Sequence, residues 1–180
     1  MENADIEVPP GTVGQIGGKG ACLTLGYFAN QEATQGSFNR DGWFLSGDLG
    51  SIDANDNLVV EGRLKDLIIR GGYNIYPSHI EALTMRHAEV EKAAAFPIAD
   101  ERLGEKVCLA VNGDVASHAI LDHLAAEGLS KYDMPEYFIR VDDFPLTASG
   151  KILKRDLVEM VKQGEIAPEA VRFQPKEGTD

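Results

Sequence analysis

The spacing of apolar residues changes along the chain near residue 64. Before this point, short apolar runs are broken by glycine and polar turns, as in residues 14–28, which is typical of short strands with tight connections. Beyond it, strand-like runs alternate with stretches in which apolar residues recur at helical spacing. We therefore expect a β-rich segment over about residues 11–62 and a mixed segment from Leu64 onward.

Within the second segment, the pattern predicts a three-stranded sheet flanked by helices. The predicted strands are residues 92–98, 105–112 and 136–141, and the helices begin near Ser78, Ser117 and Lys154. Ser78 and Glu81 have the spacing of a capping box, and Ser117 can cap the second helix. Residues after Pro168 have little to pack against and are expected to be mobile. Strands and helices alternate without clear parallel units, so the expected fold class is α+β.

An Asx-rich turn, DANDN at residues 53–57, separates two apolar runs of the first segment and predicts a hairpin. The same run superficially resembles a calcium-binding loop. However, Leu58 stands where that loop needs glycine, and Leu64 stands where it needs the bidentate Glu. We therefore reject the calcium interpretation.

Composition and charge exclude several classes of protein. With 180 residues, 43% of them hydrophobic, the chain can bury one sizeable core. Its net charge of −12, from 29 acidic and 17 basic residues, opposes nonspecific binding to nucleic acid or to an anionic membrane. No apolar run approaches the roughly 18 residues needed to span a membrane. Met1 is followed by neither a basic nor an apolar stretch, so the expected location is cytoplasmic.

The cysteines and histidines give no framework for a disulfide or a metal. The two cysteines, Cys22 and Cys108, sit among apolar neighbours and are interpreted as small buried hydrophobes. The four histidines are scattered without ligand spacing; they are His79, His87, His118 and His123. We therefore assign no metal site to the protein itself.

The most informative segment is GRLKDLIIRGGYNIYP, residues 62–77. Ile68 and Ile69 predict a buried strand or a hairpin arm. The following Gly71 and Gly72 tolerate positive φ and allow another molecule to approach the backbone closely. By itself, the segment fits an ordinary hairpin as well as it fits a region that touches ligands at both ends.

This segment resembles the domain hinge of the adenylate-forming superfamily, which contains acyl-CoA and aryl-CoA synthetases, luciferases and peptide-synthetase adenylation domains. Upstream, DGWFLSGDLGSID at residues 41–53 is similar to the family's Trp-x-x-Thr-Gly-Asp signature. Downstream, PLTASGKILKRDL at residues 145–157 is similar to its Pro-x-x-x-x-Gly-Lys signature. The three blocks stand in the family's order, and the resemblance covers nearly the whole chain. It implies the C-terminal portion of an adenylate-forming, AMP-binding enzyme.

Departures from the family pattern indicate which branch of the family the sequence resembles. Ser46 replaces the customary Thr and keeps the hydroxyl group. Ile69 stands where luciferases and plant coumarate-CoA ligases carry Lys, and GGYNIYPSHIE is closer to the form found in bacterial fatty-acyl and aryl-CoA synthetases. The resemblance therefore implies the acyl-CoA synthetase, or fatty-acid–CoA ligase, branch.

The resemblance assigns Asp48 and Arg63 to nucleotide binding. Asp48 would accept hydrogen bonds from the ribose hydroxyls, and the planar fork of Arg63 would contact ribose and phosphate oxygens. Lys65 would be the hinge, so that residues 1–64 correspond to the β-rich end of the large AMP-binding domain and residues 65–180 to the mobile C-terminal domain. Without the resemblance, a turn-forming Asp and a surface Arg explain the same residues.

Lys151 resembles the family lysine that reaches the carboxylate and the α-phosphate, and that serves only the adenylation half-reaction. Gly71 and Gly72 resemble the turn that lines the channel for the pantetheine arm of CoA. The alternatives are a solvated lysine and a plain type I′ or II′ turn. A Walker phosphate loop is excluded, because Pro145 stands at its first glycine and Ile152 at its Ser or Thr.

The resemblance implies a two-step reaction. A carboxylic acid and ATP, which brings Mg²⁺, give acyl-adenylate and pyrophosphate, and the CoA thiol then displaces AMP. The family's Ser/Thr/Gly-rich phosphate loop, its Tyr-Gly-x-Thr-Glu motif and its acid pocket are absent from these 180 residues. The missing N-terminal domain would supply them, so the acid is unidentified and the chain alone is expected to be inactive.

Two other interpretations stay open. In the first, the chain is a noncatalytic binding module that complements a separately encoded N-terminal partner. In the second, it is a fragment of a peptide-synthetase adenylation domain, although the carrier domain that normally follows such a domain does not occur in this sequence.

Overall fold

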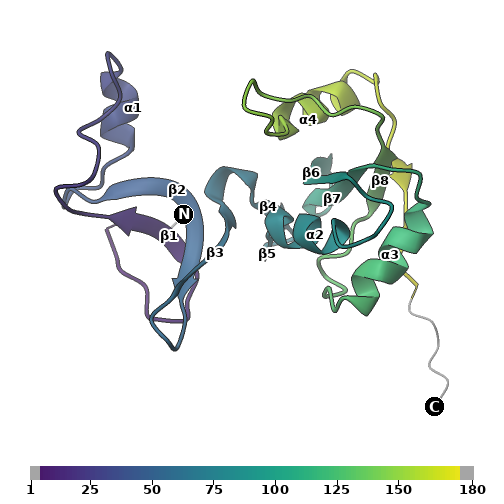
Figure 1. Ribbon diagram of the computed structural model, residues 1–180, viewed down its shortest axis with the longest axis horizontal. Coiled ribbons are helices and arrows are strands. Elements are labelled where there is room, and N and C mark those ends of the chain that lie inside the picture. Colours follow the sequence, from purple (N-terminus) through teal and green to yellow (C-terminus); the bar gives the residue numbers. More distant parts are fainter. Residues whose placement is uncertain (1–4, 175–180) are drawn as a thin grey trace. The chain divides into compact units, whose positions relative to one another are not determined.

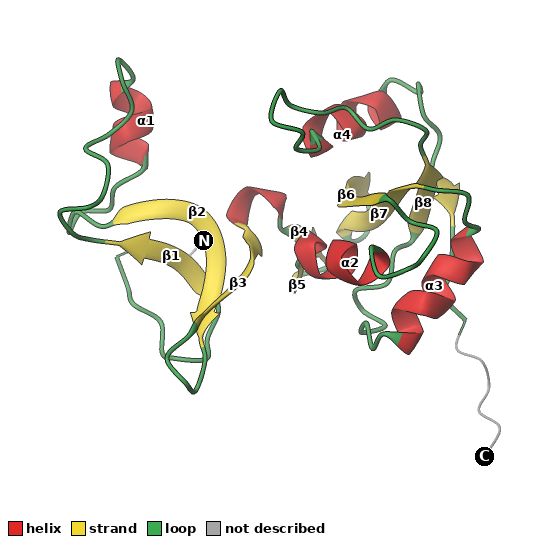
Figure 2. Cartoon of the chain, in the orientation of Figure 1, coloured by secondary structure: helices red, strands yellow, loops and turns green. Residues whose placement is uncertain are grey.

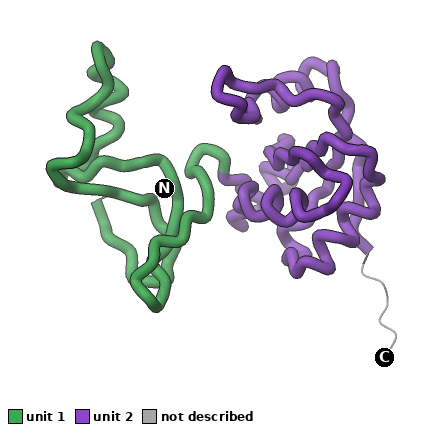
Figure 3. Tube along the Cα trace, in the orientation of Figure 1, with its two compact units in different colours: residues 1–66 green, residues 67–180 purple. Residues whose placement is uncertain are grey.

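A computed structural model describes residues 5–174 of the chain. The chain divides into two compact units, which are unit 1 (Met1–Asp66) and unit 2 (Leu67–Asp180), as Figure 3 shows.

Unit 1 is an antiparallel sheet of three strands in the order β1-β2-β3. The strands are β1 (Gly14–Gly18), β2 (Phe44–Ile52) and β3 (Leu58–Arg63), with the helix α1 (Gln31–Gly36) between β1 and β2 and the 3-10 turn η1 (Leu64–Asp66) after β3 (Figure 2). The expected β-rich character of this segment is confirmed.

The connection between β2 and β3 confirms the predicted Asx turn. The Oδ1 atom of Asp53 accepts hydrogen bonds from the backbone N–H groups of Asn55 at 2.8 Å and Asn57 at 2.9 Å. Its Oδ2 atom accepts a third from the side-chain amide of Asn57 at 3.1 Å. Because these donors favour the ionised carboxylate, with the Asn57 backbone contributing most, the pKa of Asp53 lies below its usual value.

Two features of unit 1 differ from the expectation. The sequence did not predict helix α1, whose N-terminus is capped by the side chain of Asn30 through a hydrogen bond from the Ala33 N–H at 3.0 Å. Cys22 is exposed, so its interpretation as a buried hydrophobe is wrong. It lies in a turn, where no sheet face is available to cover the side chain.

Few apolar side chains of unit 1 are buried. Leu49 in β2 is the one buried hydrophobic residue among those that the structure describes in this unit. On β3, Leu58, Val59 and Val60 are 51%, 40% and 62% exposed. Unit 1 thus has a hydrogen-bonded sheet without a hydrophobic core of its own.

Unit 2 is built on a six-stranded sheet in the order β5-β4-β7-β8-β9, with β6 paired to β7. The strands are β4 (Ile68–Arg70), β5 (Tyr73–Ile75), β6 (Lys92–Asp100), β7 (Gly104–Asn112), β8 (Tyr137–Arg140) and β9 (Glu169–Ala170). The helices are α2 (Pro77–Thr84), α3 (Ser117–Ala126) and α4 (Lys154–Lys162) (Figure 1). β6 and β7 pair as an antiparallel hairpin, whereas β7 and β8 are parallel and are connected through α3.

Alternate residues of the central strands face two separate cores. Ala95 and Leu109 belong to one core, to which α2 and α3 contribute Ile80, Leu83, Ile120, Leu121 and Leu124. Phe96 and Cys108 belong to the other core, which contains Leu157 of α4. The sheet therefore has α2 and α3 on one face and α4 on the other (Figure 1).

The expected α+β fold is confirmed. The three predicted strands correspond to β6, β7 and β8, and the three predicted helices correspond to α2, α3 and α4. The sheet is wider than expected because β4, β5 and β9 extend it. The β4–β5 hairpin is the strand or hairpin arm expected at Ile68 and Ile69, with Ile68 buried but Ile69 51% exposed. Strands β5 and β9 have three and two residues, which is too short for a periodic signal in the sequence.

Both predicted serine caps are wrong. Helix α2 begins at Pro77, with Tyr76 before it, and α3 follows Ala116; neither helix has a side-chain cap hydrogen bond. Proline suits the first helical turn because it has no N–H to satisfy and its φ is already helical. The hydroxyl of Ser117 instead donates to the carboxylate of Glu169 at 3.1 Å.

The expected mobility after Pro168 is wrong for residues 169–174. β9 pairs with β8, and the side chains of Val171 and Phe173 pack against the core beneath α2 and α3. Residues 175–180 lie outside the described part of the chain.

Candidate functional site

Asp48 and Arg63 form an ion pair across two neighbouring strands of unit 1. They are direct partners in the register of β2 and β3, and Arg63 Nε lies 2.8 Å from Asp48 Oδ1. Both side chains stay partly exposed, at 31% for Asp48 and 52% for Arg63. The backbone N–H of Asp48 donates to Ser46 Oγ at 3.0 Å, so the hydroxyl that the sequence keeps at this position fixes the turn before the carboxylate.

A bulge brings the two residues together. Next to the turn between β2 and β3, Ile52 pairs with Leu58 and Gly50 with Val60. If this register continued without a bulge, Asp48 would lie opposite Gly62. The register shifts between Leu49 and Gly50, and Asp48 instead faces Arg63. The bulge thus aims the guanidinium at the carboxylate, a common role for bulges near functional residues.

Lys65 lies in η1, next to the boundary between the two units. It is exposed, and unit 1 ends at the following residue, Asp66.

Gly71 and Gly72 form the turn of the β4–β5 hairpin. Their φ values are +59° and +85°, the type I′ pattern that only glycine adopts readily at both positions. A Cβ atom on Gly71 would lie 3.2 Å from Leu103 Cδ2, whereas one on Gly72 would meet nothing within 4 Å. The turn therefore has a close neighbour at Gly71 and open space at Gly72.

Acidic side chains from the rest of unit 2 hold this hairpin in place. The N–H of Ile69 donates to Glu105 Oε2 at 2.7 Å, and the guanidinium of Arg70 pairs with the carboxylate of Glu136. The N–H of Gly71 donates to the backbone oxygen of Leu103 at 2.7 Å. The turn is thus attached to the structure on each of three successive residues.

Lys151 stands in a loop between Phe144 and α4 that Thr147 closes. The N–H of Thr147 donates to the Lys151 oxygen at 2.8 Å, and the N–H of Lys151 donates to Thr147 Oγ1 at 3.0 Å. An isolated bridge between Leu146 and Ile152 closes the base of the loop. Gly150 has a φ of +81°, which the tight reversal before the lysine requires. Lys151 is exposed at the end of this closed loop.

Residues 79–151 match the family described as AMP-binding enzyme C-terminal domain. The matched span begins in α2 and ends at Lys151. This part of unit 2 is similar to an AMP-binding enzyme C-terminal domain.

Proteins similar to this chain include CoA ligases. The mitochondrial medium-chain acyl-CoA ligase of Danio rerio is 36% identical over 159 residues, which cover 87% of this chain and 26% of that protein. The 2-succinylbenzoate–CoA ligase of Bacillus mycoides is 38% identical over 165 residues, which cover 91% of this chain and 34% of that protein. The chain thus spans about a quarter to a third of the length of these curated relatives.

A solved structure extends the likeness to the fold. The o-succinylbenzoate coenzyme A synthetase from Bacillus subtilis, in complex with ATP and a magnesium ion, has a TM-score of 0.79 and 33% sequence identity to this chain. The match covers 87% of this chain and 32% of that protein. The adenylate-forming relatives therefore include an enzyme that binds ATP and Mg²⁺.

The residues that support the Gly71–Gly72 turn had no clear signal in the sequence. Asp100 Oδ2 lies 2.6 Å from Lys106 Nζ, and its Oδ1 accepts from the N–H of Leu103 at 2.9 Å. These contacts, the lysine first, lower the pKa of Asp100 to about 2. They hold the Leu103 carbonyl to which Gly71 donates. The only sequence signal was a Gly-Glu pair, Gly104 and Glu105, at the start of β7.

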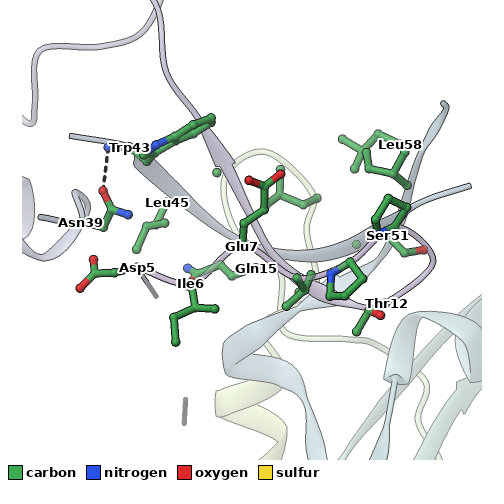
Figure 4. Close-up of a pocket in the computed structure, with 18 of the residues that line it drawn as sticks. Asp5, Ile6, Glu7, Thr12, Gln15, Asn39, Trp43, Leu45, Ser51 and Leu58 are labelled. Carbon is green, nitrogen blue, oxygen red and sulfur yellow. Dashed lines mark hydrogen bonds between the residues drawn. The ribbon is translucent and has the colours of Figure 1, made fainter. Parts of the chain in front are cut away.

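Unit 1 also contains a cavity that the sequence did not indicate. Its volume is about 510 Å³, and it is lined by residues of β1, β2 and β3 and of the segments before β1 and before β2, among them Glu7 and Trp43 (Figure 4). The N–H of Trp43 donates to Asn39 Oδ1 at 2.8 Å on its wall. Asp48 and Arg63 are not among the lining residues, so the cavity is separate from the candidate nucleotide pair.

Within residues 5–174, no three or more His, Cys, Asp and Glu side chains are grouped so that they could hold a metal ion. In the same described part of the chain, no helix has the length and hydrophobicity that a membrane span requires.

Proposed function

We propose that this chain is the C-terminal part of an acyl-CoA synthetase. In the first step, an oxygen of the carboxylic acid attacks the α-phosphorus of ATP, the bond to pyrophosphate breaks, and acyl-adenylate forms. In the second step, the CoA sulfur attacks the acyl carbon and AMP leaves. Mg²⁺ arrives with ATP and offsets the phosphate charge. A cytoplasmic location is part of this proposal.

The pairing of Asp48 with Arg63 is the observation that carries the proposal. Two residues that the family resemblance assigns to one nucleotide face each other across β2 and β3, at 2.8 Å between Nε and Oδ1. The donor set fits a nucleoside phosphate: a carboxylate suits two ribose hydroxyls, and a guanidinium suits phosphate oxygens. Partial exposure of both side chains leaves them accessible to a ligand.

In this proposal, Lys151 serves adenylation. A flexible ammonium group stabilises the negative charge that develops as carboxylate oxygen approaches phosphorus. The support is the loop that Thr147 closes, because a preorganised loop presents the exposed lysine without further ordering.

In this proposal, the second half-reaction uses the turn between β4 and β5. Gly71 and Gly72 would line the channel of the pantetheine arm, and the open space at Gly72 supports close approach by a thin ligand chain. Lys65 would be the hinge about which residues 65–180 turn relative to the domain to which residues 1–64 belong. Its exposure in a short 3-10 turn beside the unit boundary supports that role.

A complementing module is a second candidate function, in which the chain acts with a separate N-terminal partner. The specific support is unit 1, which buries only Leu49 among the described hydrophobic residues and exposes the apolar side chains of β3. Such a surface is suited to packing against a larger body.

The experiment joins this chain to the N-terminal portion of the Bacillus subtilis o-succinylbenzoate synthetase, either by fusion or by mixing. The body of that relative supplies an acid pocket of known specificity. ATP–pyrophosphate exchange and CoA thioester formation are then measured with 2-succinylbenzoate. We expect no activity from the 180 residues alone, activity from the fusion, and activity on mixing only if the chain is a complementing module. Ligase activity of the chain by itself would refute the proposal.

In the active fusion, Lys151→Ala should lower adenylation by at least about 100-fold, since it removes a charge from the transition state. CoA attack on preformed acyl-adenylate should stay largely intact. Lys162→Ala is the matched control, because Lys162 is an exposed lysine whose ion pair with Glu159 lies within the same helix α4. Equal loss of both half-reactions in Lys151→Ala would contradict the assigned role.

A further inference from the structure

One carboxylate joins three elements of unit 2. Glu81 lies in α2, and its Oε1 atom is 2.7 Å from Nζ of Lys154, the first residue of α4. The same oxygen accepts a hydrogen bond from the N–H of Ala95 in β6 at 2.7 Å. The side chains are 16% and 23% exposed, so this ion pair is largely shielded from water. Glu81 thus links α2, β6 and α4.

The contact with Ala95 gives the carboxylate a fixed position. β6 pairs only with β7 among the described strands, so one of its edges has backbone groups without a neighbouring strand. Glu81 accepts the N–H of Ala95 on this strand, and α2 itself is anchored by four buried residues: Pro77, Ile80, Leu83 and Thr84. The acceptor for Lys154 therefore sits on a rigid part of the unit.

Helix α4 depends more on the ion pair than α2 does. It has one buried residue, Leu157, and its N-cap residue Leu153 makes no side-chain cap hydrogen bond. A lysine in the first turn of a helix is also unfavourable, because that end of the helix carries partial positive charge. Glu81 compensates this charge and holds the beginning of α4 against α2 and β6.

The beginning of α4 is also the end of the Lys151 loop. Only Ile152 and Leu153 separate Lys151 from Lys154. The internal hydrogen bonds of the loop fix its shape. Its place on unit 2 depends on the packing of Phe144 and Ile152 against the core and, at the beginning of α4, on the ion pair. We propose that Glu81, through Lys154, is a positioning residue for Lys151 in the adenylation step. This inference rests on the proposed role of Lys151.

The kinetic test uses the fusion enzyme with Glu81→Gln. Glutamine keeps an acceptor for the Ala95 N–H but removes the charge that Lys154 needs. We expect kcat for ATP–pyrophosphate exchange to fall roughly 10- to 100-fold, because a misplacement of 1 Å can cost about 100-fold in rate, with KM for ATP unchanged. CoA attack on preformed acyl-adenylate should be unaffected. Lys154→Met should reproduce this result, Lys154→Arg should keep most of the activity, and the double variant should be no worse than either single one.

Lys162→Met is the matched control, because it breaks the exposed ion pair with Glu159 on the same helix and should leave kcat unchanged. A wild-type kcat in Glu81→Gln, or an equal fall in both half-reactions, would overturn the inference.

A second measurement does not depend on activity. Amide hydrogen exchange in the 180-residue chain should become at least several-fold faster in Glu81→Gln for Thr147 and Leu153, whose N–H groups hold the loop. Exchange at Leu109 in the core should not change. Unchanged exchange at Thr147 and Leu153 would overturn the inference. If the wild-type fusion shows no ATP–pyrophosphate exchange, the proposed function fails. The amide hydrogen exchange rates of Thr147 and Leu153 still decide whether the ion pair positions the loop.

Discussion

The two units are both built on hydrogen-bonded sheets, yet they differ in what those sheets bury. In unit 2, the central strands β6 and β7 are covered on both faces by helices, and two clusters of apolar side chains form. In unit 1, the described residues include one buried hydrophobic side chain, Leu49, on a sheet of comparable strand length. Backbone pairing alone therefore does not make a domain; independent stability requires apolar burial.

Separating the units tests this difference with the largest expected effect. Residues 67–180 alone should unfold cooperatively on heating, at nearly the temperature of the corresponding transition in the full chain. Residues 1–66 alone should show no cooperative transition, because they bury too little apolar surface to offset the entropy of ordering the chain. Circular dichroism and amide NMR dispersion provide the measurement. A sharp thermal transition in residues 1–66 would show that unit 1 is also stable by itself and would contradict the expected difference between the units.

Single side chains should show the same contrast at smaller scale. Phe96 is fully buried in the core that contains Leu157, so Phe96→Ala should lower the free energy of unfolding of unit 2 by about 3–5 kcal/mol. Val60 of β3 is 62% exposed, so Val60→Ala should change the stability of the full chain by no more than about 0.5 kcal/mol. Urea denaturation measures both. Similar costs for the two variants would show that unit 1 has a core that its burial pattern does not reveal.

The smallest expected contrast concerns acid. The pKa of Asp100 is lowered to about 2 from 3.8, so its contribution to stability is complete above pH 3.8 and is lost as the pH falls toward 2. Asp100→Asn should therefore flatten the dependence of unit 2 unfolding on pH within that window. Asp53→Asn in unit 1 should leave the unit 2 transition unchanged, although the pKa of Asp53 is also lowered. An equal effect of both variants on the unit 2 transition would show that the units unfold as one.

Local sequence signals predicted most of the elements. Gly71 and Gly72 indicated their turn because glycine tolerates positive φ, and the apolar spacing indicated helix α4 from its first residue, Lys154. The serine caps failed because Pro77 begins α2 and the hydroxyl of Ser117 bonds elsewhere. Propensity at a helix end is a weak signal when proline or a tertiary contact competes.

The geometry of the candidate site was less accessible to sequence reasoning. The resemblance selected Asp48 and Arg63, but their pairing depends on a bulge in β3, and nothing in the apolar pattern fixes where a bulge occurs. Glu81 and Lys154 are far apart in the chain, and only the packing of α2 and α4 on β6 brings them together. Long-range contacts of this kind leave no periodic trace.

The two cysteines differ in how accessible their thiol groups are to a chemical reagent. Cys22 of unit 1 is exposed, whereas Cys108 lies at the centre of β7 in unit 2, where burial raises the pKa of its thiol. A thiol reagent therefore modifies Cys22 directly and reaches Cys108 only when the sheet of unit 2 opens. At reagent concentrations where modification is faster than reclosing, the delay between the two reactions measures the opening rate of unit 2 in the native chain, without a substitution.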